Sequence, residues 1–143
     1  MELAPGVTLQ DRYRIVSLLD QGGMAALYRA WDTRLQVSVA MKEMLSQPGI
    51  DPHTLAQLRQ QFEQEAQTLA RLDHPHLVRV SDFFEDGDNV YLVMAFAEGE
   101  SLFKLISQGG ALPETRVLHW AEQLLDALAY CHAEGVIHRD VKP

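Results

Sequence analysis

The chain has 143 residues, of which 47% are hydrophobic, so it is long enough for one small globular domain but not for two large ones. A formal net charge of -8 and a sequence pI near 5.1 argue against general binding to nucleic acids or anionic membranes, because their phosphate groups would be repelled. With a single cysteine and no run of roughly 18 apolar residues, the sequence predicts neither an internal disulfide nor a membrane segment, and we expect a cytoplasmic protein.

The first part of the chain is predicted to form three antiparallel strands. Short runs of β-type residues alternate there with turns, and the first turn carries Gly22 and Gly23. These runs cover residues 13–19, 27–31 and 37–44. Asp51 and Pro52 then mark the start of a helix, because the aspartate side chain caps free N–H groups and proline lacks an N–H that would have no partner there. We expect this helix to run for about five turns.

The rest of the chain predicts a hairpin followed by two helices. The hairpin strands are expected at residues 77–84 and 89–96, and the helices at residues 101–107 and 113–134. Gly135 follows the second helix as a natural stop. The pattern changes from β to α at Glu98-Gly99-Glu100, which predicts two parts, residues 1–97 and 98–143, joined by a short hinge.

The predicted helix after Pro52 carries a carboxylate in its apolar stripe. That stripe consists of Leu55, Leu58, Phe62, Glu65, Leu69 and Leu72. Because leaving a buried acid unpaired costs on the order of 3 to 5 kcal/mol, we expect a fixed cation to meet Glu65. Lys42 is the best candidate, since alternation along its strand places it on the face opposite Val39 and Met41. The alternative is that Lys42 lies at a solvent edge and Glu65 turns outward.

Six ordered motifs resemble the protein-kinase signature set. They are Arg12-Tyr13-Arg14-Ile15-Val16, Gln21-Gly22-Gly23-Met24, Val39-Ala40-Met41-Lys42, Phe62-Glu63-Gln64-Glu65-Ala66, His74-Pro75-His76-Leu77-Val78 and His138-Arg139-Asp140-Val141-Lys142-Pro143. In this order they resemble the first strand, glycine-rich loop, third strand, αC helix, turn into the fourth strand and catalytic loop of bacterial eukaryotic-like (Hanks-type) serine/threonine kinases. The resemblance covers almost the whole chain. It implies an α+β, protein-kinase-like fold: a five-stranded antiparallel N-lobe with αC, and the first helices of an incomplete α-helical C-lobe.

The resemblance also implies a role for individual residues. Lys42 would pair with the α- and β-phosphates of ATP while Glu65 holds it in place. Asp140 would accept the proton of the substrate hydroxyl, and Lys142 would contact the γ-phosphate, which favours serine or threonine over tyrosine as the acceptor. Further ATP-binding positions implied are Leu19, Gly22, Gly23, Leu27, Ala40, the gatekeeper Met94, and the backbone of Ala95 and Ala97.

The sequence departs from the family pattern in the glycine-rich loop and at its end. In the G-x-G-x-x-G arrangement, Asp20 and Ala25 replace the first and third glycines, and we expect the Asp20 carboxylate to weaken ATP binding by repulsion. The chain ends at Pro143, before the family's metal-binding asparagine and Asp-Phe-Gly triplet. ATP and Mg²⁺ are the implied cofactors, with the metal ligands expected beyond Pro143.

Two hypotheses about function follow from these motifs. The favoured one is an ATP-dependent protein serine/threonine kinase, present here as an N-terminal fragment that is inactive alone. The alternative is a pseudokinase-like nucleotide-binding or regulatory module, which the altered glycine-rich loop supports. We assign no metal site: His74 and His76 are interpreted as structural, because no acidic or cysteine partner stands near them at ligand spacing.

Overall fold

The computed structural model of the chain describes residues 3–23, 25–44, 49–139 and 141. The chain forms two compact units by the contacts within it. The first contains Met1–Arg71 and Val78–Ala97, and the second contains Leu72–Leu77 and Glu98–Pro143. The short segment Leu72–Leu77 therefore belongs to the second unit, although it lies between two parts of the first.

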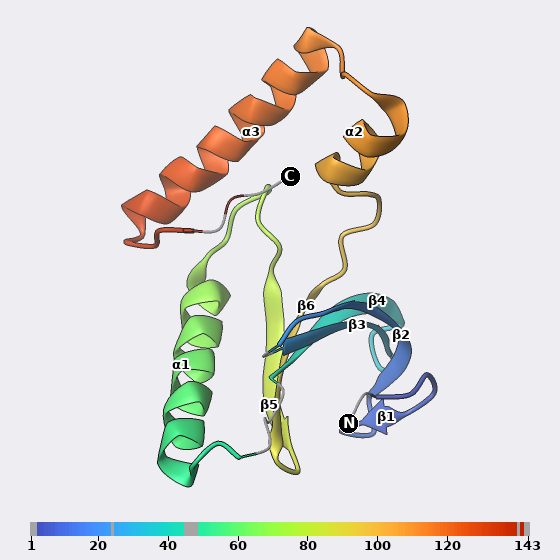
Figure 1. The fold of residues 1–143 in the computed structure, drawn as a ribbon, viewed down its shortest axis with the longest axis vertical. Coiled ribbons are helices and arrows are strands. Elements are labelled where there is room, and N and C mark those ends of the chain that lie inside the picture. The colour runs from blue at the N-terminus through green and yellow to red at the C-terminus, as the bar shows by residue number, and fades with distance from the viewer. Residues whose placement is uncertain (1–2, 24, 45–48, 140, 142–143) are drawn as a thin grey trace. The chain divides into compact units, whose positions relative to one another are not determined.

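The first unit is an antiparallel sheet with one helix (Figure 1). Six strands are found among the described residues, in the order β1-β2-β3-β4-β6-β5. Their bounds are β1 Thr8–Leu9, β2 Tyr13–Gln21, β3 Ala25–Asp32, β4 Val37–Met44, β5 Val80–Asp86 and β6 Asn89–Ala95. The sequence predicted five strands. The extra strand, β1, pairs Thr8 with Arg14 and Leu9 with Tyr13, and two residues are too few to show an alternating pattern.

The sheet carries a different apolar cluster on each face. On β4, Val39 and Met41 belong to one cluster, whereas Met44 belongs to the other. The first cluster contains Leu9, Tyr13, Ile15, Ala26, Tyr28, Ala30, Val39, Met41, Tyr91 and Val93. The second contains Met44, Phe62, Ala66, Val90 and Leu92. Strands β4 and β6 are thus covered on both faces, because successive side chains of a strand point to opposite sides.

The helix α1 (Pro52–Arg71) covers the second cluster. Its start agrees with the sequence-based expectation, since the Asp51 Oδ1 atom accepts hydrogen bonds from the N–H groups of His53 and Thr54 at 3.1 and 3.0 Å. Phe62 and Ala66 are its buried residues. The Phe62 ring packs against Phe83 of β5 with 6.2 Å between ring centroids. This contact fixes the helix against the sheet.

The β2–β3 and β3–β4 hairpins differ in regularity. The pairing of β2 with β3 shifts register twice, between Ile15 and Ser17 and between Leu18 and Asp20. In contrast, each residue of β3 from Ala25 to Asp32 pairs in unbroken register with β4. β4 therefore lies in a regular ladder, whereas the strand leading to the glycine turn is bulged.

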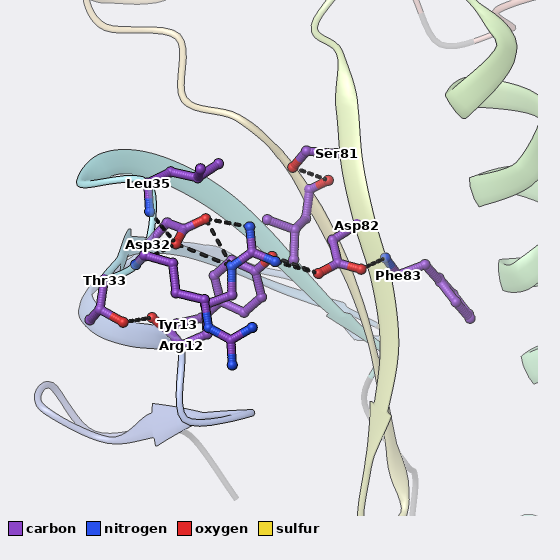
Figure 2. A network of polar contacts seen from close by, with 10 residues as sticks. Arg12, Tyr13, Asp32, Thr33, Leu35, Ser81, Asp82 and Phe83 are labelled. Atoms are coloured by element: carbon purple, nitrogen blue, oxygen red, sulfur yellow. Dashed lines mark hydrogen bonds and ion pairs between the residues drawn. The ribbon is translucent and has the colours of Figure 1, made fainter.

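A polar cluster closes the end of the sheet near the β3–β4 turn (Figure 2). Asp32 is 1% exposed, and its Oδ2 atom accepts from Arg12 Nη2 at 2.7 Å. Its Oδ1 atom accepts from the N–H groups of Arg34 and Leu35 at 2.9 and 3.0 Å. The Tyr13 hydroxyl donates to Asp82 Oδ2 at 2.6 Å. The cluster links the start of β2, the end of β3 and β5.

The second unit contains α2 (Leu102–Gly109) and α3 (Glu114–Ala133). Both helices were expected within one or two residues at each end. The Ser101 hydroxyl caps α2 by accepting from the Lys104 N–H group at 3.2 Å. Gly135 follows α3 with a φ of 78°, a left-handed conformation that glycine adopts without strain. Among the described residues, no helix has the length and apolar character needed to cross a membrane.

The segment Leu72–Leu77 is held against α3 by hydrogen bonds. His74 Nε2 lies 2.9 Å from Asp126 Oδ2, and His74 Nδ1 accepts from the His76 N–H group at 3.1 Å. The Tyr130 hydroxyl accepts from the Asp73 N–H group at 3.0 Å. Both ring nitrogens of His74 are used within the unit, which supports the interpretation of this histidine as structural.

We predict that Asp32→Asn lowers the free energy of unfolding by about 3 kcal/mol at about pH 7, because it leaves a buried polar cluster without its charged acceptor. The hydrogen bond from Arg12 lowers the pKa of Asp32 in the folded chain from its ordinary 3.8. The carboxylate therefore stabilises the fold above pH 3.8, and this contribution is lost as the pH falls below that value. Urea denaturation of both proteins at several pH values measures the difference.

The control is Asp88→Asn, since the Asp88 side chain is 97% exposed and its loss should change stability little. The difference between wild type and Asp32→Asn should shrink as the pH falls below about 4. A difference that stays constant down to about pH 2 would contradict the prediction.

Candidate functional site

Lys42 is held near the end of β4 by partners on both sides. It pairs across the sheet with Leu27 of β3 and Leu92 of β6. Its Nζ atom lies 3.4 Å from Glu65 Oε1 and 5.5 Å from the centre of the Phe62 ring, both on α1. The expected ion pair between the strand and the helix is therefore present.

The burial that we predicted for Glu65 is not observed. The Lys42 and Glu65 side chains are 33% and 51% exposed, so no buried charge requires compensation. Phe62 and Ala66 form the centre of the helix face that meets the sheet. Glu65 lies about 100° around the helix from Ala66, which puts its carboxylate at the margin of that face. The pair is thus an accessible one, open to a third charged group.

Leu27, Ala40 and Met94 are apolar side chains on the same face of the sheet as Lys42. Leu27 stands directly opposite Lys42, Ala40 lies two residues before it, and Met94 stands opposite Ala40. Ala40 is 8% exposed, and Leu27 and Met94 are partly buried. Leu19 of β2 is 45% exposed, next to a register shift. The structure therefore brings a small apolar surface beside an ammonium group.

The glycine turn joins β2 to β3 and leaves open space around its backbone. The Gly22 N–H group donates to the Ala25 carbonyl at 2.9 Å. A Cβ atom added to Gly23 would meet no heavy atom within 4 Å, and one added to Gly22 would meet only that carbonyl, at 3.9 Å. Neither glycine has a positive φ. Packing within the chain therefore gives no reason for glycine at these two positions.

The residues that replace glycines in this turn take part in the strands. Asp20 pairs with Leu27, and its Oδ1 atom accepts from the Gln21 N–H group at 2.9 Å. Ala25 begins β3 and pairs with Met44. The Asp20 carboxylate is thus turned toward its own backbone and is exposed.

Ala95 and Ala97 lie at and just after the end of β6. The Ala95 N–H group donates to the Arg79 carbonyl at 2.9 Å, and both alanines are exposed. Between them, the Phe96 ring receives the guanidinium of Arg29 at 4.7 Å from its centre. This contact was not predicted from the sequence, although Arg29 lies two residues after Leu27 and thus on the same face of β3.

Two of the predicted catalytic residues, Asp140 and Lys142, lie outside the described residues. The segment before them is attached to α3, since the Val136 N–H group donates to the Cys131 carbonyl at 2.8 Å. Arg139 is exposed and has a φ of 62°. The roles of Asp140 and Lys142 therefore stay predictions.

Glu43 was missed by the sequence analysis, although it follows Lys42 directly. Its side chain is 0% exposed and accepts hydrogen bonds from Tyr28, Asn89 and Tyr91. A signal was available, because alternation places residue 43 on the same face as Val39 and Met41. An acid at a core position of a strand indicates a polar network.

Comparison with known proteins decides the family of the chain. A family model described as the protein kinase domain matches residues 13–143. The chain belongs to the protein kinase family. Within that family, the serine/threonine-protein kinase pkn2 of Myxococcus xanthus is 39% identical over 142 residues, which are 99% of this chain. PknA of Mycobacterium tuberculosis is 39% identical over 143 residues, covering 96% of this chain.

Solved kinase structures show the same fold. The apo form of PpkA-294 superposes with a TM-score of 0.84 at 28% identity, covering 99% of this chain and 55% of that one. The PknI kinase domain of M. tuberculosis superposes with a TM-score of 0.77 at 29% identity, covering 99% of this chain and 55% of that one. The expected α+β kinase fold is thereby confirmed. The chain spans only 16% of the length of pkn2 and 32% of PknA, so it corresponds to a part of these relatives.

We predict that Glu65→Gln changes the free energy of unfolding by less than about 1 kcal/mol, because an exposed ion pair contributes little to stability. Phe62→Ala on the same helix should lower it by about 3 to 5 kcal/mol, since Phe62 fills the second apolar cluster. Urea denaturation of the three proteins measures both effects. A loss in Glu65→Gln as large as that in Phe62→Ala would restore the burial argument.

Proposed function

We propose that this protein is an ATP-dependent protein serine/threonine kinase, and that its first unit supplies the ATP-binding wall. The observation that carries the proposal is the Lys42–Glu65 pair on a sheet face that also presents Leu27, Ala40 and Met94. Protein kinases use ATP with Mg²⁺. An ammonium group beside an apolar surface matches a ligand that has a flat base at one end and phosphates at the other.

Each part of the proposed site has a chemical role. Lys42 would contact the α- and β-phosphates, and Glu65 would orient its ammonium group. Leu19, Leu27, Ala40 and Met94 would contact the adenine, and the backbone of Ala95 and Ala97 would hydrogen-bond its edge. The open space at Gly22 and Gly23 supports a close approach of the phosphates to the turn.

The transfer step is proposed from the catalytic-loop residues. Asp140 would accept the proton of a serine or threonine hydroxyl of the substrate. The hydroxyl oxygen would attack the γ-phosphorus as the bond from that phosphorus to the ADP oxygen breaks. Lys142 would neutralise charge on the transferred phosphoryl group. Mg²⁺, when bound, would neutralise charge on the β- and γ-phosphates, and we assign no ligand for it among the described residues.

A nucleotide-binding regulatory module is the second candidate function. Asp20 and Ala25 favour it, because two of the three glycine positions in the loop are altered. Such a module would bind ATP but transfer no phosphate. Measuring binding and transfer separately therefore distinguishes the two candidates.

The cytoplasm is the compartment that we propose for this part of the protein. Its single cysteine, Cys131, is buried and unpaired. A buried free thiol is typical of reducing compartments, where it serves as a small apolar side chain.

For binding, we predict that Lys42→Met weakens the affinity for ATP at least about tenfold, because a charge-assisted hydrogen bond to a phosphate is lost. Isothermal titration calorimetry of the chain with ATP measures this. Lys104→Met is the matched control, since Lys104 is half exposed, pairs with Glu100 and lies on α2. Equal affinities of wild type and Lys42→Met would contradict the proposed role of Lys42.

For transfer, we predict that the protein translated to the end of its reading frame moves labelled γ-phosphate from ATP to serine or threonine of a generic protein substrate. Asp140→Asn should lower this rate by about a hundredfold or more, because the proton acceptor is lost. Phosphoamino-acid analysis identifies the acceptor residue. ATP binding with no transfer in the wild type would instead favour the regulatory module.

A further inference from the structure

A buried carboxylate lies directly behind the candidate lysine. Glu43 is 0% exposed, and its side chain accepts three hydrogen bonds. The Tyr28 hydroxyl donates to Oε2 at 3.0 Å, while the Tyr91 hydroxyl and the Asn89 amide each donate to Oε1 at 2.9 Å. Tyr28 belongs to β3, and Asn89 and Tyr91 belong to β6. One carboxylate therefore joins the three adjacent strands β3, β4 and β6.

The three partners of Glu43 are all donors, which matches a group that offers only acceptors. Burial raises the pKa of the Tyr91 hydroxyl, so this group keeps its proton. The Tyr28 hydroxyl accepts from the Leu3 N–H group at 3.2 Å, and its own proton is directed at Glu43. The Phe84 ring stacks on Tyr91 at 5.1 Å between ring centroids and limits its movement.

Stability alone does not explain this network. Among the described residues, Glu43 has no ion-pair partner, whereas the other buried acid, Asp32, is paired with Arg12. An apolar side chain of similar volume is often as good or better for stability than a buried charged group. Apolar packing depends little on orientation, whereas a hydrogen bond weakens steeply when its geometry is disturbed. A hydrogen-bonded carboxylate therefore fixes the orientation of its strand more closely than an apolar side chain would.

The hydrogen bonds of the Glu43 carboxylate restrain the direction in which the Lys42 side chain points. Successive side chains of a strand point to opposite faces, so any rotation of β4 about its axis moves Glu43 and Lys42 together. β4 ends at Met44, so Lys42 lies near the end of the strand, where backbone pairing opens most easily. The bonds of Glu43 on the core face therefore restrain the lysine on the other face.

We propose that Glu43 is a positioning residue, which anchors β4 through Tyr28, Asn89 and Tyr91 so that Lys42 is directed at the phosphates of a bound nucleotide. This inference rests on the proposed function of Lys42. Glu65 contacts the ammonium group itself, whereas Glu43 sets the backbone from which that group extends. The lysine thus has one anchor on each face of the sheet.

The test compares Glu43→Leu with Glu43→Gln by ATP titration of the chain, at a temperature where circular dichroism shows each protein folded. Glu43→Leu should bind ATP about tenfold more weakly, because Lys42 is no longer held in line with a phosphate. Glu43→Gln should stay within about threefold of wild type. Its carbonyl still accepts from Tyr91 and Asn89, and its amide can donate to Tyr28.

Asp32→Leu is the matched control for a merely structural role. It removes the other buried carboxylate of the same sheet, at the end of the β3–β4 ladder remote from Lys42. It should lower stability and leave ATP affinity unchanged. Wild-type affinity in Glu43→Leu overturns the proposal, and so does an equal loss of affinity in Asp32→Leu. A Glu43→Gln variant as weak as Glu43→Leu overturns it as well, because charge rather than direction would then matter.

A second readout needs no nucleotide. Acetylation by a small amine-reactive reagent, followed by peptide mass spectrometry, gives the modification rate of Lys42 relative to Lys104. Glu43→Leu should raise this ratio severalfold as Lys42 leaves Glu65, whereas Glu43→Gln and Asp32→Leu should not change it. An unchanged ratio in Glu43→Leu overturns the proposal.

The two readouts separate failure of the inference from failure of the proposed function. If the wild type binds no ATP, the proposed function fails, and the acetylation ratio still decides the role of Glu43. If Glu43→Leu does not fold, Tyr91→Phe takes its place, because it removes a single donor of the network. Tyr91→Phe should also raise the acetylation rate of Lys42 relative to Lys104, and an unchanged ratio would overturn the proposal.

Discussion

The candidate site depends on the alternation of side chains along β4. This strand lies between β3 and β6 and has an apolar cluster on each face, so each of its side chains enters one of two surroundings. Val39, Met41 and Glu43 face one cluster, and Ala40 and Lys42 face the side covered by α1. A shift by one residue would turn Lys42 into the first cluster and turn Val39 and Met41 out of it, which is why register is strongly specified here.

Much of this arrangement was predictable from periodicity. The spacing of apolar residues indicated the element types and the pairing of Lys42 with Glu65, because strands and helices place side chains at fixed intervals. The start of α1 followed from Asp51 and Pro52, whose capping chemistry is local in sequence. β1 was not predicted, because a strand of two residues is too short to show an alternating pattern of apolar and polar side chains. Asp140 and Lys142 rest on resemblance to the kinase catalytic loop.

Charge burial was less predictable, because it depends on partners distant in the sequence. Glu65 occupies an apolar stripe yet is half exposed, since the contact between helix and sheet is narrower than the stripe. Asp32 and Glu43 are buried, and their partners lie up to 48 residues away. Position 43 could have been flagged by alternation, but nothing local in the sequence identifies Tyr28, Asn89 and Tyr91 as its donors.

The two register shifts in β2 separate the strand that leads to the glycine turn from the regular ladders of β4. The bulged pairing of β2 with β3 carries the glycine turn, whereas the unbroken ladders of β4 with β3 and β6 carry the lysine. Bending at the bulges breaks no hydrogen bond of β4. The strand pairing that shapes the approach to the turn is therefore different from the pairing that places the lysine.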